Sequence, residues 1–205
     1  MVRKLVSVLV VAAAAGLILS PTVWAAGSGT KGSATKPQKA AAFTLEDPDG
    51  NKVSLSDFAD KIVVLYWVNW DCPFDKRHHT AGTLKTLAGK YKDKGVVFLG
   101  INSTKYQTKA DNKKMIAHYG LPYTVLDDHP GDVGHAYKAR TSPDIRIIDK
   151  KQTIVYSGGL DNDPRGKRRD DLVNYVEQAL DELLAGKAVS VPVTKPWGCT
   201  VKYAK

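Results

Sequence analysis

Two cysteines, Cys72 and Cys199, carry the most reactive side chains in this chain of 205 residues. A cysteine reacts as its thiolate, which is favoured at a helix N-terminus or beside a cation. Cys72 follows a strongly apolar run and precedes Pro73, which suits the first position of a helix because its missing N–H would have no partner there. We therefore expect Cys72 to cap a helix, with its thiolate stabilised by the positive end of the helix dipole.

Arg77 follows on the same expected helix, about one turn from the sulfur. A cation at that position would stabilise the thiolate further, so Arg77 is a candidate catalytic residue beside Cys72. Each residue also has a structural interpretation, in which Cys72 is a small buried hydrophobe and Arg77 belongs to an exposed turn. The location of Cys72 at a strand-to-helix junction favours the reactive interpretation.

Cys199 is the second cysteine of the chain and lies close to its end. Three hypotheses stay open for it: it resolves an oxidised Cys72 by forming a disulfide, within the chain or across a dimer; it forms a permanent disulfide; or it is free. A permanent disulfide closing so long a loop would contribute roughly 4–5 kcal/mol to stability. Trp197 and Tyr203 flank Cys199 and are expected to anchor this segment on the domain.

Hydrophobic patterns between residues 43 and 186 predict the elements that must position these sulfurs. The continuous apolar run Ile62 to Val68 is typical of a strand buried on both faces. The other predicted elements are a hairpin over 43–55, a helix from Pro73 to Gly95, a strand over 96–101, a helix over 109–119, a strand over 123–126, a helical turn over 133–138, hairpin strands over 144–148 and 153–156, and a helix over 170–184. This order predicts an α/β sandwich with a mixed sheet, whose site lies beyond the carboxyl ends of the strands.

The two ends of the chain fall outside the predicted domain. Residues 1–25 have the layout of a secretory signal, with Arg3 and Lys4 before an apolar run and small residues at the expected cleavage position. Residues 26–42 are predicted to be a flexible linker, and residues 187–205 a C-terminal tail. We therefore expect a protein exported to the periplasm or the extracellular space, with an uncleaved membrane anchor as the alternative.

The basic composition does not predict a nucleic-acid partner, although the formal net charge is +9. The basic residues are spread through the chain, and export argues against that partner class. His78 and His79 are adjacent, so they point in different directions on a helix and do not form a ligand pair. We expect no metal ion and no cofactor.

Three local patterns resemble the redoxin group of thioredoxin-fold proteins, the alkyl hydroperoxide reductase and thiol-specific antioxidant class. They are the segment from Phe43-Thr44-Leu45 to Asp57-Phe58, the apolar strand leading into Trp-x-x-x-x-Cys-Pro at 67–73, and Thr141-Ser142-Pro143 before the strand at 145–148. The resemblance implies a thioredoxin-like sandwich, a mixed central sheet flanked by helices, with an N-terminal hairpin and an extended tail. It also implies that Pro143 is similar to the cis-proline that packs against the active cysteine. Pro73, Pro143, Ser142 and Trp70 are therefore expected to shape the active site.

The chain departs from two patterns of the families it resembles. It has no Cys-x-x-Cys pair, so a local disulfide of the thioredoxin type cannot form. In peroxiredoxins a threonine precedes the cysteine by three positions, and Asn69 takes that place here as a candidate catalytic residue. Leu65 replaces the proline four positions earlier.

The expected function is reduction of peroxides by a single active cysteine, with an external thiol as reductant. The first alternative is a thiol-disulfide oxidoreductase acting on envelope proteins. The second is a binding module that has kept the fold without the chemistry. A homodimer is compatible with each of these functions.

Overall fold

The computed structural model describes residues 38–168 and 170–204, so the predicted signal and most of the predicted linker lie outside the described residues. An eight-stranded mixed sheet has the order β1-β9-β8-β4-β5-β6-β2-β3, and a two-stranded sheet pairs β10 with β7. The strands are β1 Gln38–Lys39, β2 Thr44–Glu46, β3 Lys52–Ser54, β4 Ile62–Trp67, β5 Val96–Asn102, β6 Val125–Asp127, β7 Thr141–Ser142, β8 Asp144–Ile148, β9 Thr153–Gly158 and β10 Cys199–Thr200. The helices are α1 Pro73–Thr80, α2 Thr83–Tyr91, α3 Lys109–Tyr119, α4 Asp132–Ala136 and α5 Tyr175–Leu184, with 3₁₀ turns at Leu55–Phe58 and Lys92–Lys94.

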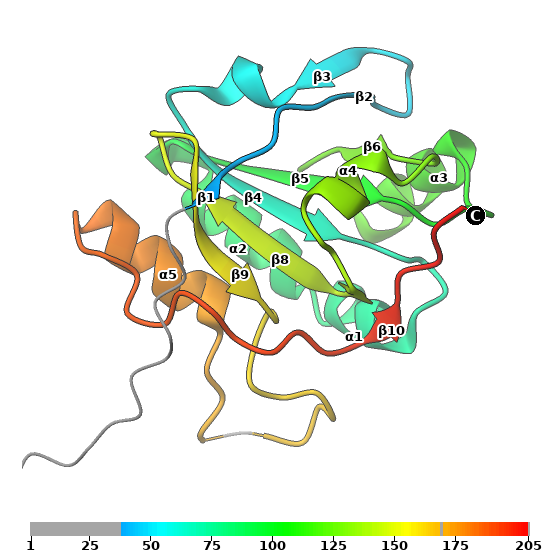
Figure 1. Cartoon of the computed structure of the whole chain (residues 1–205). Helices are drawn as coiled ribbons and strands as arrows, with labels where there is room; N and C mark the ends of the chain where they lie inside the picture. Colours follow the sequence, from blue (N-terminus) through cyan, green and yellow to red (C-terminus); the bar gives the residue numbers. More distant parts are fainter. Residues whose placement is uncertain (1–37, 169, 205) are drawn as a thin grey trace, which may run out of the picture. The chain divides into compact units, whose positions relative to one another are not determined.

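Strand β4 lies at the centre of the sheet, parallel to β5 and antiparallel to β8. Its side chains alternate between two cores, because successive residues of a strand point to opposite faces. Val64 and Tyr66 pack with α2, α3 and α5 on one face, whereas Leu65 and Trp67 pack with α4 and the N-terminal hairpin on the other. In Figure 1 the carboxyl end of β4 and the amino end of β8 lie close to α1 and β10. Cys72 directly precedes α1, and Cys199 is the first residue of β10. The predicted mixed α/β sandwich is confirmed.

The long helix predicted from Pro73 to Gly95 is divided into α1 and α2. Gly82 adopts φ +67°, a left-handed conformation that ends a helix and that glycine tolerates. The apolar positions Ala81, Leu84 and Ala88 have helical spacing across Gly82, so periodicity alone predicted one helix where the backbone forms two.

Helix α5 begins at Tyr175, five residues later than predicted. The side-chain oxygen of Asn174 accepts hydrogen bonds from the amides of Val176 and Glu177 at 3.1 and 3.0 Å and thereby caps the helix. Leu172, which lies within the helix predicted over 170–184, precedes the observed helix and is 49% exposed.

The predicted linker ended at residue 42, but the structure places its last residues in the fold. Strand β1 pairs antiparallel with β9, and the carbonyl of Ala41 accepts a hydrogen bond from Tyr137 at 2.7 Å. The short strand carries no apolar period, because only Gln38 and Lys39 form it and both are exposed.

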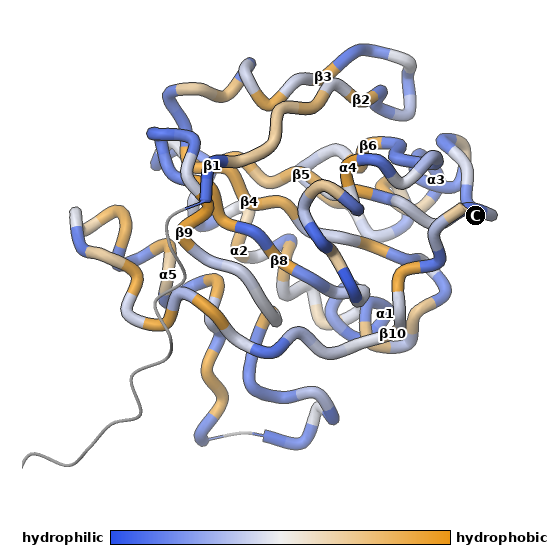
Figure 2. Tube along the Cα trace, viewed as in Figure 1, coloured by the Kyte–Doolittle hydropathy of each residue, from blue (hydrophilic) through white to orange (hydrophobic). Residues whose placement is uncertain are grey.

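The C-terminal tail crosses the amino end of β8, where β10 pairs with β7, and ends beside α4 (Figure 1). Tyr203 stacks on His135 with ring centroids 4.0 Å apart and donates a hydrogen bond to the carbonyl of Ala139 at 2.8 Å. A Cβ on Gly134 would lie 2.5 Å from the Tyr203 ring, so a glycine is needed for this close approach. Figure 2 shows that the tail is mixed in hydropathy rather than continuously apolar. Within residues 38–168 and 170–204, no helix has the length and apolar character needed to cross a bilayer.

Candidate active site

The two cysteines lie side by side at the carboxyl end of β4. Cys72 is the N-cap residue of α1, as predicted, and Pro73 takes the first helical position. The Cys72 thiol donates a hydrogen bond to the carbonyl of Ser142 at 3.0 Å. Cys199 is the residue of β10 that pairs with Ser142, and its thiol contacts that of Cys72. Both thiols are reduced in this structure.

The thiol of Cys72 is not activated in this arrangement, because burial outweighs the stabilisation of its thiolate that the helix N-terminus was expected to provide. Only 1% of Cys72 is exposed, and burial raises the pKa of its thiol to about 12. The hydrogen bond with Cys199 and the charge of Asp75 raise the pKa further, while the amides of Asp75 and Cys199 lower it by less. The amide of Asp75, in the first turn of α1, is the contribution of the helix N-terminus to this balance. Desolvation therefore outweighs the helix N-terminus on which the sequence-based expectation depended.

Asp75 lies beneath the sulfur and is fully buried. Its carboxyl group accepts hydrogen bonds from the hydroxyls of Tyr66 and Ser142 and from the amide of Asn69, the last at 2.9 Å. Burial raises the pKa of Asp75 to about 7, although these three hydrogen bonds act in the opposite direction. A carboxyl group with this pKa can hold or release a proton at neutral pH. We call Tyr66, Asn69, Asp75 and Ser142 the buried floor.

His79 completes the polar surroundings of the buried floor. Its Nε2 atom lies 3.2 Å from the Tyr66 hydroxyl, and its ring stacks on Tyr119. Burial lowers the pKa of His79 to about 4, so the ring is neutral at pH 7. Asp75 is therefore the group of this cluster whose charge changes near neutral pH.

Asn69 and Trp70 shape the site from the side of β5 and α3. The side-chain oxygen of Asn69 accepts hydrogen bonds from the amide of Asp71 at 2.9 Å and from Gln107 at 3.1 Å. The indole N–H of Trp70 donates to Asn112 at 2.8 Å. The Asn69 oxygen is thus engaged within the protein, in a polar network that orients the loop before Cys72.

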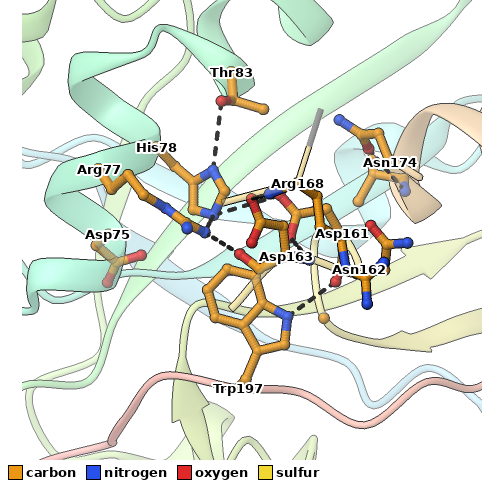
Figure 3. Close-up of polar contacts among 12 residues, drawn as sticks. Asp75, Arg77, His78, Thr83, Asp161, Asn162, Asp163, Arg168, Asn174 and Trp197 are labelled. Carbon is orange, nitrogen blue, oxygen red and sulfur yellow. Dashed lines mark hydrogen bonds and ion pairs between the residues drawn. The ribbon is translucent and has the colours of Figure 1, made fainter. Parts of the chain in front are cut away.

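Arg77 does not approach Cys72, contrary to expectation. Its guanidinium donates to the carbonyl of Asp163 at 2.6 Å, lies 3.2 Å from Nε2 of His78 and sits over the Trp197 ring at 5.1 Å (Figure 3). The side chain leaves α1 on the side that faces the loop after β9. It connects that loop and the tail to α1 instead of providing a charge for the sulfur.

Trp197 anchors the tail directly before Cys199, as the sequence led us to expect. Its indole N–H donates to the carbonyl of Asp161 at 2.9 Å, as Figure 3 shows. Its ring also contacts Phe74 and His78, with centroids 5.8 and 5.4 Å away. Residues 197–203 are called the docked tail below.

Two backbone features bring β10 against β7. The Ser142–Pro143 peptide bond is cis, which confirms the similarity of Pro143 to a cis-proline. Gly198 has φ +146°, and a Cβ there would lie 2.1 Å from the carbonyl oxygen of Ser142. A glycine before Cys199 is therefore required for the close contact that places the two thiols together.

Several residues of the site escaped the sequence analysis. Asp75 is the most important of them. Its position in the first turn after Cys72 could have identified it as a site residue, but acidic residues are common in the first turn of any helix. The others are far apart in sequence and share only polar character: Tyr66, His79, Asn102, Gln107 and Asn112. Their burial, which distinguishes them, is a property of the folded chain.

A protein-family model described as the AhpC/TSA family matches residues 37–157. The chain belongs to this family. The resemblance drawn from the patterns around Phe43, Cys72 and Pro143 is thereby confirmed, together with the thioredoxin-like fold class. The match ends within β9, so α5 and the docked tail with Cys199 lie outside it.

Relatives of this AhpC/TSA chain carry two kinds of name. Thiol-disulfide oxidoreductase ResA of Bacillus thuringiensis is 29% identical over 119 residues, which cover 58% of this chain and 66% of the relative. Chloroplastic peroxiredoxin Q of Triticum aestivum is 32% identical over 162 residues, 71% of this chain and 69% of the relative. A hypothetical protein of Sinorhizobium meliloti has a solved structure with a TM-score of 0.76 at 29% identity, covering 84% of this chain and 97% of its own. The family is one of thiol-dependent oxidoreductases, and its members' names do not choose between a peroxide and a disulfide as substrate.

Proposed function

We propose that this protein is a thiol-disulfide oxidoreductase that cycles between a Cys72/Cys199 dithiol and an intramolecular disulfide. The observation that carries the proposal is the contact of the two thiols across the β7–β10 pair. Exchange needs a second thiol that attacks the mixed disulfide and thereby displaces the substrate thiol. Cys199 and Cys72 meet this requirement without a Cys-x-x-Cys motif.

The redox cycle balances with one external disulfide and one external reductant. The dithiol passes two electrons and two protons to a disulfide R–S–S–R′, releases two thiols and becomes the Cys72–Cys199 disulfide. An external dithiol then reduces that bond and restores the starting state. Asp75 supports the cycle because a buried carboxyl group with a pKa of about 7 can take up the proton that Cys72 must lose.

Peroxide reduction is the second candidate function, favoured by the similarity to peroxiredoxin Q. Here Cys72 would be oxidised to a sulfenic acid with release of water or an alcohol, and Cys199 would displace water from it to form the same disulfide. The engaged side chain of Asn69 and the raised pKa of Cys72 argue against fast peroxide attack in the docked state.

The proposal also includes where the protein acts and which partners it uses. The signal-like residues 1–25 support export, where oxidising conditions supply protein disulfides as substrates. An external thiol protein is the expected reductant. The pairing of both sulfurs within one chain makes the proposed cycle independent of a homodimer.

A redox titration with mass spectrometry tests the proposed function. The reduced protein is equilibrated in glutathione buffers, and its free thiols are alkylated and counted by mass. We expect one two-electron transition in which Cys72 and Cys199 lose reactivity together. Cys72→Ser and Cys199→Ser each abolish it, with the fold checked by circular dichroism. A wild-type protein that keeps two free thiols, or that carries only glutathione adducts, would contradict the proposal.

One equivalent of hydrogen peroxide separates the two candidate reactions. If disulfide exchange is the function, glutathione disulfide oxidises the pair faster than the same concentration of peroxide does. If peroxide forms the Cys72–Cys199 disulfide within seconds at micromolar concentration, the second candidate replaces the first.

A further inference from the structure

The two sulfurs of the site differ sharply in their access to a partner. Cys72 is 1% exposed, whereas Cys199 is partly exposed. Its neighbour on β10, Thr200, is exposed to solvent. A disulfide bond can be attacked only by a sulfur that reaches it, so access limits which thiol reacts first.

The residues around Cys72 leave little room for a partner disulfide. Its thiol is held by the carbonyl of Ser142 at 3.0 Å and contacts Cys199. Trp197 packs on Phe74, which lies two residues after Cys72 in the first turn of α1. The docked tail would therefore have to leave before a protein disulfide could reach Cys72.

The backbone of the docked tail is held on both sides of Cys199. The amide of Val201 donates to the carbonyl of Arg140 at 3.1 Å, and the amide of Lys105 donates to the carbonyl of Lys202 at 2.8 Å. With Trp197 bonded to Asp161 as well, Cys199 is held in its partly exposed position without any movement of the tail.

We infer that Cys199 is the sulfur that attacks the substrate disulfide and that Cys72 is the resolving sulfur, the reverse of the order expected from the sequence. This assignment rests on the proposed function and deepens it. The thiolate of Cys199 attacks R–S–S–R′, forms a Cys199–S–S–R bond and releases R′–S⁻. The thiolate of Cys72 then attacks the sulfur of Cys199, forms the Cys72–Cys199 bond and releases R–S⁻. The substrate disulfide is reduced, the two cysteines are oxidised, and the released thiolates take up protons.

The buried floor agrees with a resolving role for Cys72. Burial raises the pKa of Cys72 to about 12, which keeps this thiol protonated and poorly reactive before the mixed disulfide has formed. Asp75 lies close enough to raise that pKa by its charge, and its own pKa of about 7 allows it to accept a proton when Cys72 reacts. Tyr66, Tyr123 and His79 are the other titratable groups around Asp75, and each is buried.

Stopped-flow reaction of single-cysteine variants with 5,5′-dithiobis(2-nitrobenzoate) tests the order. Cys72→Ser, which retains Cys199, is expected to react at the rate of the first phase of the wild-type protein. Cys199→Ser, which retains Cys72, is expected to react at least about 10-fold more slowly, because Cys72 is 1% exposed and burial, the largest cause, raises the pKa of its thiol. Equal rates, or a faster reaction of Cys199→Ser, would overturn the assignment.

Two controls separate access from other effects. In guanidinium chloride both variants should react at the same rate, because unfolding exposes both sulfurs. A rapid quench of the wild-type reaction with acid, followed by peptide mass spectrometry, avoids substitutions altogether. The nitrothiobenzoate adduct is expected on Cys199 at the earliest times, and an adduct first found on Cys72 would refute the inference.

The same wild-type reaction keeps the two proposals apart. Release of two nitrothiobenzoate ions for each chain, with a Cys72–Cys199 disulfide as product, supports the proposed function whichever sulfur reacts first. A stable single adduct would contradict the proposed function itself. The order of reaction is then decided by the quench alone.

Discussion

The buried floor and the docked tail meet at Cys72 but are built in different ways. The floor consists of side chains from β4, α1 and β7 and of the Asn69 amide from the loop after β4. Its central group, Asp75, has no exposed surface and accepts three hydrogen bonds. The tail is held by Trp197, by Tyr203 and by single backbone hydrogen bonds, and most of its residues are partly exposed.

This difference separates two tasks of one site. A buried network keeps a fixed geometry and can hold a proton whose pKa is set by desolvation. A partly exposed segment at the end of the chain opens at a lower free energy than a core strand. We therefore assign proton control to the floor and presentation of the second sulfur to the tail.

The largest expected effect concerns the charge of the floor. The pKa of Asp75 rises from 3.8 in the unfolded chain to about 7 in the fold. The folded state therefore binds more protons between these values, and stability falls as pH rises through this range, by about 4 kcal/mol in total. In Asp75→Asn this contribution disappears. From pH 4 to pH 7 the unfolding free energy of the wild type should therefore fall by nearly that value more than the unfolding free energy of the variant.

Urea unfolding at several pH values measures this change in slope. The overall stability of Asp75→Asn also changes, because an amide cannot accept all the hydrogen bonds of a carboxylate, so the slope is the relevant readout. His78 and His79, whose pKa values burial lowers to about 4, make stability rise with pH between 4 and 6.5 in both proteins and cancel in the comparison. Asp93→Asn, on the exposed turn after α2, is the matched control. Parallel curves for the wild type and Asp75→Asn would disprove the assignment of proton control to the floor.

The second effect concerns the close approach of the tail to β7. Gly198→Ala places a Cβ against the carbonyl of Ser142 and strains a backbone with φ +146°. With strain of about 1–3 kcal/mol at such a position, we expect formation of the Cys72–Cys199 disulfide to slow by roughly 30-fold. The rate is measured by stopped flow after addition of 5,5′-dithiobis(2-nitrobenzoate).

Gly186→Ala provides the matched control for this change. Gly186 also has a positive φ, of +71°, but no atom would touch its Cβ. It should lose stability without slowing the disulfide. If both variants form the disulfide equally fast, the contact of Gly198 with Ser142 does not position Cys199.

A third, smaller effect should follow from loosening the docked tail. Trp197→Ala removes the hydrogen bond to Asp161 and the ring contacts with Phe74 and His78. We expect Cys72 to become about 10-fold more reactive toward iodoacetamide, because a lost anchor of about 1–2 kcal/mol raises the open population by that factor. Val193→Ala, on an exposed part of the tail, serves as control. An unchanged alkylation rate would show that Trp197 does not keep Cys72 covered.

The smallest effect is expected at Arg77. Because its guanidinium contacts Asp163 rather than the sulfur, Arg77→Gln should change the rate at which the disulfide forms by less than about twofold. A cation that stabilised the thiolate would cost about tenfold or more when removed. Lys76→Gln, next to it on α1, is the control for a simple change in net charge. A tenfold loss in Arg77→Gln alone would restore the catalytic role expected from the sequence.

Much of the fold was predictable because its signals are local. The apolar run of β4, the turn before β3 and the capping residues of α3 are each written in a few neighbouring residues, and α3 has the predicted bounds. The signals that failed were local as well. Gly82 was predicted to lie inside one long helix but separates two. Leu172 was predicted to lie inside the last helix but precedes it.

For the candidate site, the sequence by itself determined that Cys72 caps a helix after a buried strand and that Pro143 precedes the neighbouring strand. It also left Cys199 as the single partner within the chain. Only the tertiary structure decided that the two sulfurs touch, that Arg77 turns away and that Asp75 lies beneath Cys72. The physical reason is that burial and contact between distant segments set the pKa and the access of a thiol, and neither property belongs to a residue and its neighbours in sequence.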